Sequence, residues 1–373
     1  MPEAELRLNN PALSWRAPTA RVLVNGQHVP GVTEAEVIAN SHYAAATFRV
    51  ALAVDAVGAP PAPFWAATTD ALVDLQFSLD GTGFVSLIQG AVDSVVLDPI
   101  GGTLQIEGRD LTAALIETRT QETFSNRTSS EIATILAQRH DLTPVVTATT
   151  TSVGRYYQNE HDRITLDQFS HATTEWDLLV FLAREEGFDV FVQGTSLYFQ
   201  PPTGSTIPPL VVQPDMLIGL ALQRSLTLAR DIEVTVKSWN SRQKNSFTQT
   251  ARAAALAPSG SAGAPPSPPQ QYVYVRPNLT PNQALQFAQR RLAELSSHER
   301  TITLQMPGEL SLTPQNTLLL DGTGTGFDQL YMIDVIERSL DWRGGFRQRI
   351  RARNSSPRNE TTTPADVVMS VTG

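Results

Sequence analysis

Residues 21–109 consist of short segments of alternating apolar and polar residues, separated by tight-turn signals. The first segment is centred on Asn25-Gly26, a dipeptide that tolerates the positive φ angles of a type I′ hairpin turn. A second turn signal is the run from Asp80 to Gly83. Further strands are predicted at 46–54, 72–79, 85–97 and 103–107, with a Pro-rich loop at 58–64. Short strands without a long helical period predict a small antiparallel β domain over residues 1–108, either a barrel or a sandwich.

The periodicity becomes helical after residue 109. Thr128 and Glu131 have the spacing of a capping box, in which a hydroxyl and a carboxylate each satisfy a free backbone donor. Thr174 and Asp177 repeat that spacing, and Gly187 occupies the position of a C′ glycine. A hairpin is predicted next, with strands at 188–192 and 197–199. These signals predict an α/β middle domain over residues 109–202.

The β pattern returns at 211–240 and again at 301–354. Between them, Thr280 and Pro281 mark the start of a helix. Residues 251–270 are rich in Ala, Pro, Ser and Gly and cannot bury enough apolar surface to offset their ordering entropy. We therefore predict a second β domain formed by 203–240 and 300–356. It is interrupted by an insertion at 241–299, with a mobile loop and one helix, and followed by a C-terminal tail at 357–373.

Composition excludes several classes of function. The chain has no Cys, which rules out disulfides, thiolate metal sites and cysteine nucleophiles. Lys and Arg number 28 against 37 Asp and Glu, and the net charge of −9 argues against a general binder of nucleic acid or anionic membranes. The N-terminus lacks the apolar core of a signal peptide, and the longest strongly apolar run, 178–183, is too short to span a bilayer. We expect a soluble protein made in a cytoplasm.

The sequence contains no convincing catalytic, cofactor or metal motif. Glu185 and Glu186 are neighbours that point about 100° apart on a helix, so they do not converge as an acid/base pair. The six histidines have no metal-ligand spacing, and no Gly-x-Ser-x-Gly elbow occurs. The Gly-rich run at 321–326 precedes a predicted strand rather than a helix, which indicates a hairpin turn and not a phosphate loop. We assign no catalytic, cofactor-binding or metal-binding residue and expect no cofactor.

Four large aromatic residues lie in periodic segments, where their bulk favours burial over ligand binding. The predicted core residues are Trp176, Phe188, Trp239 and Trp342.

One local basic stripe stands out near the C-terminus. Arg347, Arg349, Arg351 and Arg353 alternate with other residues, so on a strand all four guanidinium groups lie on one face. The stripe is a candidate interface for an acidic protein surface or a nucleic-acid backbone, and otherwise a solvated face paired with nearby carboxylates. Protein contact or intramolecular pairing is favoured because the whole chain is acidic.

Four stretches, in a fixed order, resemble a known family. They are Gly108 to Leu111; Glu175-Trp176-Asp177 through Phe188 to Phe199; Val236 to Asn240; and Met306-Pro307-Gly308 through Asp334 to Leu340. Together they resemble the phage late control protein D family, which comprises tail baseplate hub proteins related to the N-terminal part of type VI secretion spike proteins. The resemblance reaches from about residue 100 to 355, and the N-terminal barrel matches only in pattern.

The resemblance implies a mainly β, α+β protein in which two small antiparallel β-barrels flank the α/β middle domain. It further implies a homotrimer whose six barrel modules form a pseudo-six-fold ring. Such a ring adapts a six-fold tail tube to a three-fold spike. Closed rings need large complementary surfaces, and a charged fraction of only 17% suits them.

The resemblance therefore predicts a structural, non-enzymatic baseplate hub in a phage tail, a domesticated tail or a secretion system. The expected partners are other copies of the chain, the tail tube protein, a separate trimeric spike protein and other baseplate proteins. DNA is expected only as transiting cargo, and the location is the virion tail baseplate, assembled in the host cytoplasm. The alternative is a tail-associated cell-wall-degrading enzyme. A sugar-binding adhesin, with Phe64 and Trp65 as its exposed aromatics, is the least favoured hypothesis.

Overall fold

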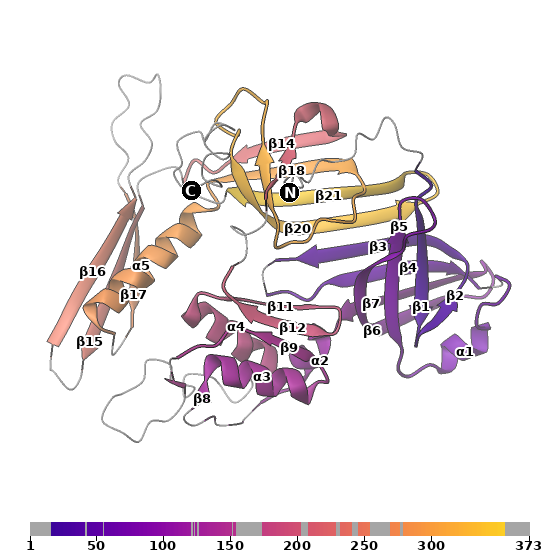
Figure 1. The fold of residues 1–373 in the computed structure, drawn as a ribbon, viewed down its shortest axis with the longest axis horizontal. Coiled ribbons are helices and arrows are strands. Elements are labelled where there is room, and N and C mark those ends of the chain that lie inside the picture. The colour runs from indigo at the N-terminus through magenta and orange to yellow at the C-terminus, as the bar shows by residue number, and fades with distance from the viewer. Residues whose placement is uncertain are drawn as a thin grey trace, which may run out of the picture.

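The computed structural model describes residues 16–41, 43–54, 56–120, 122, 124, 127–150, 152–153, 174–202, 208–228, 232–240, 245–253, 269–276 and 279–354. Within these residues the chain is mainly β, as predicted. Most strands belong to one large sheet whose pairings are antiparallel except for one (Figure 1). Apart from the short helix α1 (Ala62–Ala67), the described α-helices lie in the middle of the chain and in the segment inserted before the last strands.

The first β region holds seven strands and one short helix. Its elements are β1 (Thr19–Val24), β2 (Gln27–Val29), β3 (Val32–Asn40), β4 (Thr47–Ala53), α1 (Ala62–Ala67), β5 (Leu72–Ser78), β6 (Val85–Asp98) and β7 (Thr103–Asp110). The β1–β2 turn has positive φ at Asn25 and Gly26, as predicted. The strands order as β3-β4-β7-β6-β5-β1-β2, and β5 and β1 run across the direction of β3, β4 and β7 (Figure 1). The sheet thus folds over a core that includes Val22, Leu75 and Ile106.

The predicted loop at 58–64 is partly helical. Helix α1 begins at Ala62, directly after Pro61, and its one buried residue is Trp65. Because Trp65 packs into the core of the first β region, its burial stabilises a helical turn that the Pro-rich composition concealed.

The middle region contains three helices and a small sheet. Its elements are α2 (Thr112–Glu117), β8 (Arg127–Thr128), α3 (Ser129–Arg139), β9 (Thr143–Val146), β10 (Ser152–Val153), α4 (Glu175–Glu186), β11 (Asp189–Gln193) and β12 (Ser196–Gln200). Both predicted capping boxes are present, at Thr128 and Thr174, and Gly187 ends α4 with φ of 74°. Strands β11 and β12 form the predicted hairpin, with β9 parallel to β12. Leu136, Leu182 and Phe199 lie in a separate core.

The second β region extends the large sheet. Its elements are β13 (Leu210–Val212), the 3-10 helix η2 (Pro214–Met216), β14 (Gly219–Arg224), β18 (Arg300–Pro307), β19 (Thr317–Leu320), β20 (Leu330–Asp341) and β21 (Gly345–Asn354). Strand β20 pairs with β3 of the first region, so the order β14-β18-β21-β20 continues into β3-β4-β7-β6. Its own core includes Leu304, Tyr331 and Ile350.

The two predicted β-barrels are not closed in the described part of the chain. Residues of β1 and β3 lie near one another, yet no backbone pairing joins these strands. Each region is instead a folded sheet with open edges, because β3 and β20 use their edges to pair with each other.

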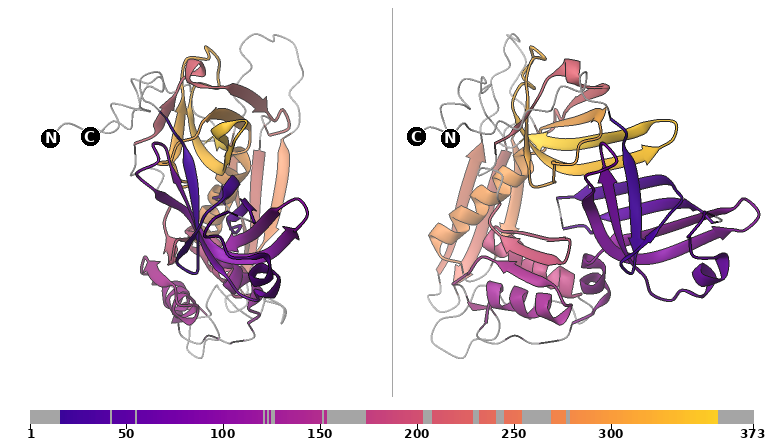
Figure 2. Two further views of the ribbon diagram at one scale, coloured as in Figure 1. Left: turned by 90° about the vertical axis from the view of Figure 1, so that its right-hand side faces the viewer. Right: turned by 45° about the vertical axis from the view of Figure 1, so that its right-hand side comes forward.

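The inserted segment forms a layer of its own. It consists of β15 (Ile232–Asn240), β16 (Asn245–Ala253), β17 (Gln270–Val275) and α5 (Pro281–Ser296), with strand order β16-β15-β17. We predicted 232–240 within the second β-barrel, but β15 pairs with β16 and β17 because its alternate residues Val234 and Val236 pack against Ala288 of α5. This layer lies on the side of the middle region away from the first β region (Figure 2). Most of the predicted mobile loop, 254–268, and the predicted tail at 357–373 fall outside the described residues.

None of the described helices combines the length and apolar character that a bilayer crossing requires.

Candidate functional site

The arginine stripe lies on one face of β21, as the alternation predicted. Arg347, Arg349 and Arg351 are exposed and Arg353 is half-buried. Arg349 Nη1 is 3.9 Å from Glu337 Oε2, and Arg353 Nε is 3.5 Å from Asp334 Oδ1. Two of the four guanidinium groups therefore have intramolecular carboxylate neighbours. The Arg349–Glu337 pair is exposed, and exposed pairs contribute about 1 kcal/mol or less.

The face that carries the stripe continues across both β regions. Residues directly opposite one another on paired strands share a face, and Arg349, Glu337, Ile38, Thr47 and Arg109 form one such row. We call this surface the charged face. Its remaining ion pairs include Arg49 Nη2 to Glu36 Oε2 at 2.7 Å. Arginine and carboxylate side chains thus lie among neutral residues on this face, a composition like that of the polar rim of protein interfaces.

The Gly108-Arg109-Asp110 motif stands where β7 leads into the middle region. The Arg109 guanidinium forms two hydrogen bonds to Asp93, at 2.6 and 2.7 Å, and one to Glu117 at 2.5 Å. These carboxylates hold the pKa of Arg109 above its ordinary value. Because Asp93 is on β6 and Glu117 on α2, Arg109 fastens the first turn of the middle region to the sheet.

A cavity of about 160 Å³ lies where the first, middle and second regions meet. Asp110 lines it and accepts hydrogen bonds from the backbone N–H groups of Ala46 and Thr112, at 2.9 and 3.0 Å. Burial raises the pKa of Asp110 to about 6 despite these bonds. On another wall, Arg338 donates to the carbonyl oxygens of Glu309 and Leu312, and burial lowers its pKa to about 10.

Asp110 and Arg338, the two charged residues that line this cavity, are both hydrogen-bonded to the backbone. The cavity is also smaller than the ~300 Å³ typical of small-molecule sites. The arrangement therefore serves to join three regions of the chain rather than to hold a ligand.

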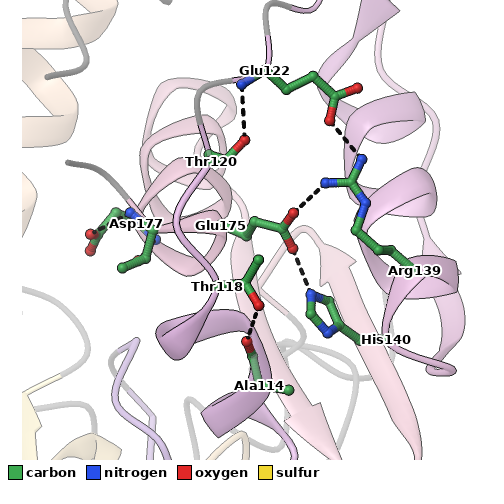
Figure 3. Close-up of polar contacts among 9 residues, drawn as sticks. Ala114, Thr118, Thr120, Glu122, Arg139, His140, Glu175 and Asp177 are labelled. Atoms are coloured by element: carbon green, nitrogen blue, oxygen red, sulfur yellow. Dashed lines mark hydrogen bonds and ion pairs between the residues drawn. The ribbon is translucent and has the colours of Figure 1, made fainter. Parts of the chain in front are cut away.

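A buried carboxylate organises the middle region (Figure 3). Glu175, in the first turn of α4, is fully buried; Arg139 Nη1 and His140 Nε2 contact its two oxygens, the latter at 2.6 Å. Arg139 Nη2 also donates to Glu122 Oε2 at 2.6 Å, and Glu122 raises the pKa of Arg139. Both oxygens of Glu175 are occupied by protein donors, so the cluster ties α3 to α4. Nothing in the local sequence distinguishes Glu175 from any other first-turn acid, so this cluster was not predicted.

The predicted core aromatics divide into two pairs. Trp176 is buried in the middle region, where its Nε1 donates to the Tyr43 carbonyl oxygen at 2.7 Å. Phe188 is half-buried against the same core, and its ring centroid is 5.3 Å from that of Phe199.

The burial predicted for the other two aromatics is wrong in this chain. Trp239 is 48% exposed and Trp342 is 80% exposed. Trp239 lies on the face of β15 opposite the one that packs on α5, since it alternates with the buried Ser238. Trp342 occupies the turn between β20 and β21, where the Arg343 guanidinium stacks 4.7 Å from its ring centroid. The prediction of burial considered only the size of the side chains. Trp239 is exposed because it lies on the outer face of its strand, and Trp342 is exposed because it lies in a turn.

The carboxylates of Glu185 and Glu186 have different partners. Glu186 Oε1 accepts from Ser129 Oγ at 2.7 Å, while Glu185 Oε1 is 3.5 Å from Arg276 Nη2 of the inserted layer. The described residues contain no cluster of three metal-ligating side chains. The Gly-rich loop is a β19–β20 connection, as predicted, and its Thr323 and Gly324 N–H groups donate to Asp328.

Comparisons with known proteins agree with this architecture. The family described as the Alg8 N-terminal domain matches residues 93–340, more than half of the chain. No curated protein sequence matches. Among solved structures, the tail protein from Neisseria meningitidis MC58 superposes with a TM-score of 0.65 at 14% identity, over 90% of this chain and 96% of that one.

Two further structures have the same arrangement. The 43 kDa tail protein of prophage MuSo2 from Shewanella oneidensis has a TM-score of 0.65 at 15% identity, over 91% of this chain and 99% of that one. The Escherichia coli c3393 protein, a component of the type VI secretion system, has a TM-score of 0.52 at 13% identity, over 93% and 80% of the two chains. Identities this low establish the fold alone. The predicted likeness to phage tail proteins is confirmed at that level, and the chain belongs to the Alg8 N-terminal domain family.

Proposed function

We propose that this protein is a structural component of a phage tail or a related contractile injection machine, and specifically its baseplate hub. The observation that carries the proposal is the fold shared with two tail proteins, one of them from a prophage, over nine-tenths of this chain and nearly all of theirs. The shared fold therefore supports a role of the whole chain in a tail, because it extends over about nine-tenths of the residues.

The proposed hub is a homotrimer. Each chain contributes two β regions, and three chains together supply six similar modules around one axis. One end of such a ring matches a six-fold tail tube and the other a three-fold spike, which we propose to be a separate polypeptide. The charged face is proposed to line or border a hydrated surface of this assembly, with DNA only as transiting cargo. The proposed location is the tail baseplate of the virion, assembled in the host cytoplasm with other baseplate proteins.

The proposed role is non-enzymatic. It is supported by the occupied carboxylates: Glu175, Glu185 and Glu186 all contact structural partners rather than an open cleft. A turbidity assay on peptidoglycan tests this point. Clearing that depends on the purified protein favours the cell-wall-degrading alternative and contradicts the structural role.

Light scattering combined with electron microscopy of the same peak tests the assembly. We expect a particle of three times the 40.6 kDa chain mass, with a ring outline and a central channel. A monomer that forms no ring even with the spike and tube proteins of its own particle contradicts the hub proposal.

A further inference from the structure

The two β regions repeat one strand arrangement. In sheet order, β14-β18-β21-β20 is followed by β3-β4-β7-β6. The corresponding strands also occur in the same order along the chain, since β3, β4, β6 and β7 match β14, β18, β20 and β21. Beyond β6 the sheet continues into β5 and β1, as it continues into β19 and β13 beyond β20.

Each β region has a β-bulge at an aspartate that pairs with an arginine on the neighbouring strand, and this shared feature aligns the residues of the two regions. The pairing of β6 with β7 shifts at Asp93, and the pairing of β20 with β21 shifts at Asp334. Asp93 is paired with Arg109 of β7, and Asp334 with Arg353 of β21. Asp93 therefore corresponds to Asp334 and Arg109 to Arg353.

The same register extends to the outer strands. Arg109 lies opposite Thr47 of β4, and Thr47 lies opposite Ile38 of β3. In the second region, Arg353 lies opposite Thr301, which lies opposite Gln223 of β14. Gln223 therefore occupies the position of Ile38. By the same count of three residues from the bulge, Val96 of β6 corresponds to Glu337 of β20.

The two β regions are joined inside the chain where β20 pairs with β3. The equivalent strands at the other ends of the two regions have no such partner within the described chain. The second half of β20 pairs antiparallel with β3, with Glu337 opposite Ile38 and Arg338 opposite Val37. The equivalent half of β6 pairs only with β7 among the described strands, and β14 pairs only with β18. The large sheet therefore has two edges without a partner strand among the described residues, at β14 and at the second half of β6. These two edges correspond to β3 and β20, which pair with each other inside the chain.

Both edges have the surface of an uncovered interface. Val96 is 59% exposed on β6, beside a groove lined by Trp65, Val95 and Leu97. On β14, Leu222 lies opposite the buried Ile302, so it points to the core side of the sheet, yet it is 36% exposed. Strand β14 contains no Pro, and its only charge is Arg224 at one end. Neither residues 94–97 of β6 nor residues 219–223 of β14 include a proline or a charged residue, features that commonly keep the edge strands of monomers from pairing. Helix α1 lies beside β6 and shares the lining of the groove there.

We infer that β14 of one copy pairs antiparallel with residues 94–98 of β6 in the next copy, in the register of the internal β20–β3 junction. That register sets Val96 opposite Gln223 and Leu97 opposite Leu222. Leu97 and Leu222 then meet on the core side, as Arg338 and Val37 do within the chain. Each copy presents one edge of each kind, so the contact is head-to-tail, the kind of contact that builds a ring when the rotation between copies closes and a filament when it does not. In the trimer of the proposed function, on which this inference rests, three internal junctions alternate with three between copies.

Disulfide trapping tests the register, because the chain has no Cys of its own. Residues directly opposite on antiparallel strands have Cα atoms about 4.5–5.5 Å apart, within the range that a disulfide spans. We expect the variant Val96→Cys with Gln223→Cys to oxidise into a covalent three-chain species on a denaturing gel. The internal pair Ile38→Cys with Glu337→Cys is the positive control and links within one chain. The offset pair Val96→Cys with Ala221→Cys, displaced by two residues, is expected to link at least tenfold more slowly.

A second variant tests the edge without cysteine chemistry. Leu222→Lys places a charge on the core side of the β14 edge and is expected to reduce the oligomer fraction at least tenfold in light scattering. Ala221→Lys is the matched control, since Ala221 lies opposite Thr303 on the outer face. Equal effects of the two lysines contradict the inference.

The outcomes separate this inference from the proposed function. A three-chain particle whose designed pair does not link overturns the edge pairing and leaves the hub trimer intact. If the designed disulfide links four or more chains, or a ladder of increasing size, the edge pairing is supported and the trimer is contradicted. A monomer without links, at high concentration and with spike and tube proteins present, contradicts both.

Discussion

Two glycines allow β6 and β7 to cross at close range. A Cβ atom added to Gly108 would lie 2.0 Å from the Ala91 carbonyl oxygen and 2.6 Å from Phe48 Cζ. A Cβ on Gly90 would lie 2.0 Å from the Arg109 carbonyl oxygen. Contacts this short involve backbone, which cannot yield without moving a strand.

We expect Gly108→Ala to lower the free energy of unfolding by roughly 3 kcal/mol, the upper part of the range for overpacking. Gly83→Ala is the matched control, because a Cβ at Gly83 meets nothing within 4 Å, and it should change stability by less than about 0.5 kcal/mol. Urea denaturation of both variants measures the difference. Equal stability of the two variants contradicts the packing argument.

Asp110 makes stability depend on pH in an unusual direction for a carboxylate. Its pKa rises from 3.8 to about 6 in the folded chain because burial disfavours the charged form. A raised carboxyl pKa favours folding below the unfolded value, and this contribution is lost as pH rises through about 6. The loss amounts to at most about 3 kcal/mol.

Unfolding free energies measured from pH 3.5 to 8 check this prediction. The difference in stability between the wild-type chain and Asp110→Asn should shift against the wild type as pH rises from about 4 to 7, since Asn cannot ionise. If the unfolding free energies of the two proteins change in the same way with pH, the prediction for Asp110 is wrong.

At the scale of elements, the packing of α4 on α3 depends on a charge that no solvent reaches. Glu175→Gln removes the carboxylate that Arg139 and His140 share. Breaking one side of a buried ion pair costs about 3–5 kcal/mol, and we expect roughly 3 kcal/mol because Arg139 keeps Glu122. Glu131→Gln changes an equivalent first-turn acid that is exposed, so it should have an effect below about 0.5 kcal/mol. Thermal unfolding of the two variants decides between them, and similar melting temperatures contradict a structural role for Glu175.

At the scale of the whole molecule, Phe346 joins the two β regions. It belongs to β21, yet its side chain lies in the core of the first region, with its ring centroid 5.1 Å from that of Phe77. Gly308 leaves space for the ring, since a Cβ there would lie 2.1 Å from Phe346 Cδ1. A residue of the second region thus completes the core of the first.

We expect Phe346→Ala to cost roughly 3–5 kcal/mol and to accelerate amide hydrogen exchange in β5 as well as in β21. Ile350→Ala, which lies in the core of the second region, should accelerate exchange there and leave β5 protected. Trp342→Ala should leave stability within about 0.5 kcal/mol of the wild type, because its ring is exposed. Exchange confined to β21 in Phe346→Ala indicates that the two regions are not coupled through this ring.

Local signals predicted the elements well, for identifiable reasons. The Asn25-Gly26 turn, the caps at Thr128, Thr174 and Thr280, and the C-terminal glycine of α4 each depend on neighbours within four residues. Trp176 was placed correctly because its helix has a clear apolar face. These features are properties of the backbone and its nearest side chains, so the sequence alone determined them.

The pairing of distant segments was decided only in the tertiary structure. Strand β15 has the same alternation as its neighbours, and only the packing of α5 assigns it to a separate sheet. The cluster around Glu175 and the junction of β20 with β3 join residues 35 or more positions apart. Periodicity states which face of a strand is apolar, but it does not state which strand lies beside it. That choice depends on the free energy of all pairings together, and it determined the open edges of β6 and β14 from which we infer the ring.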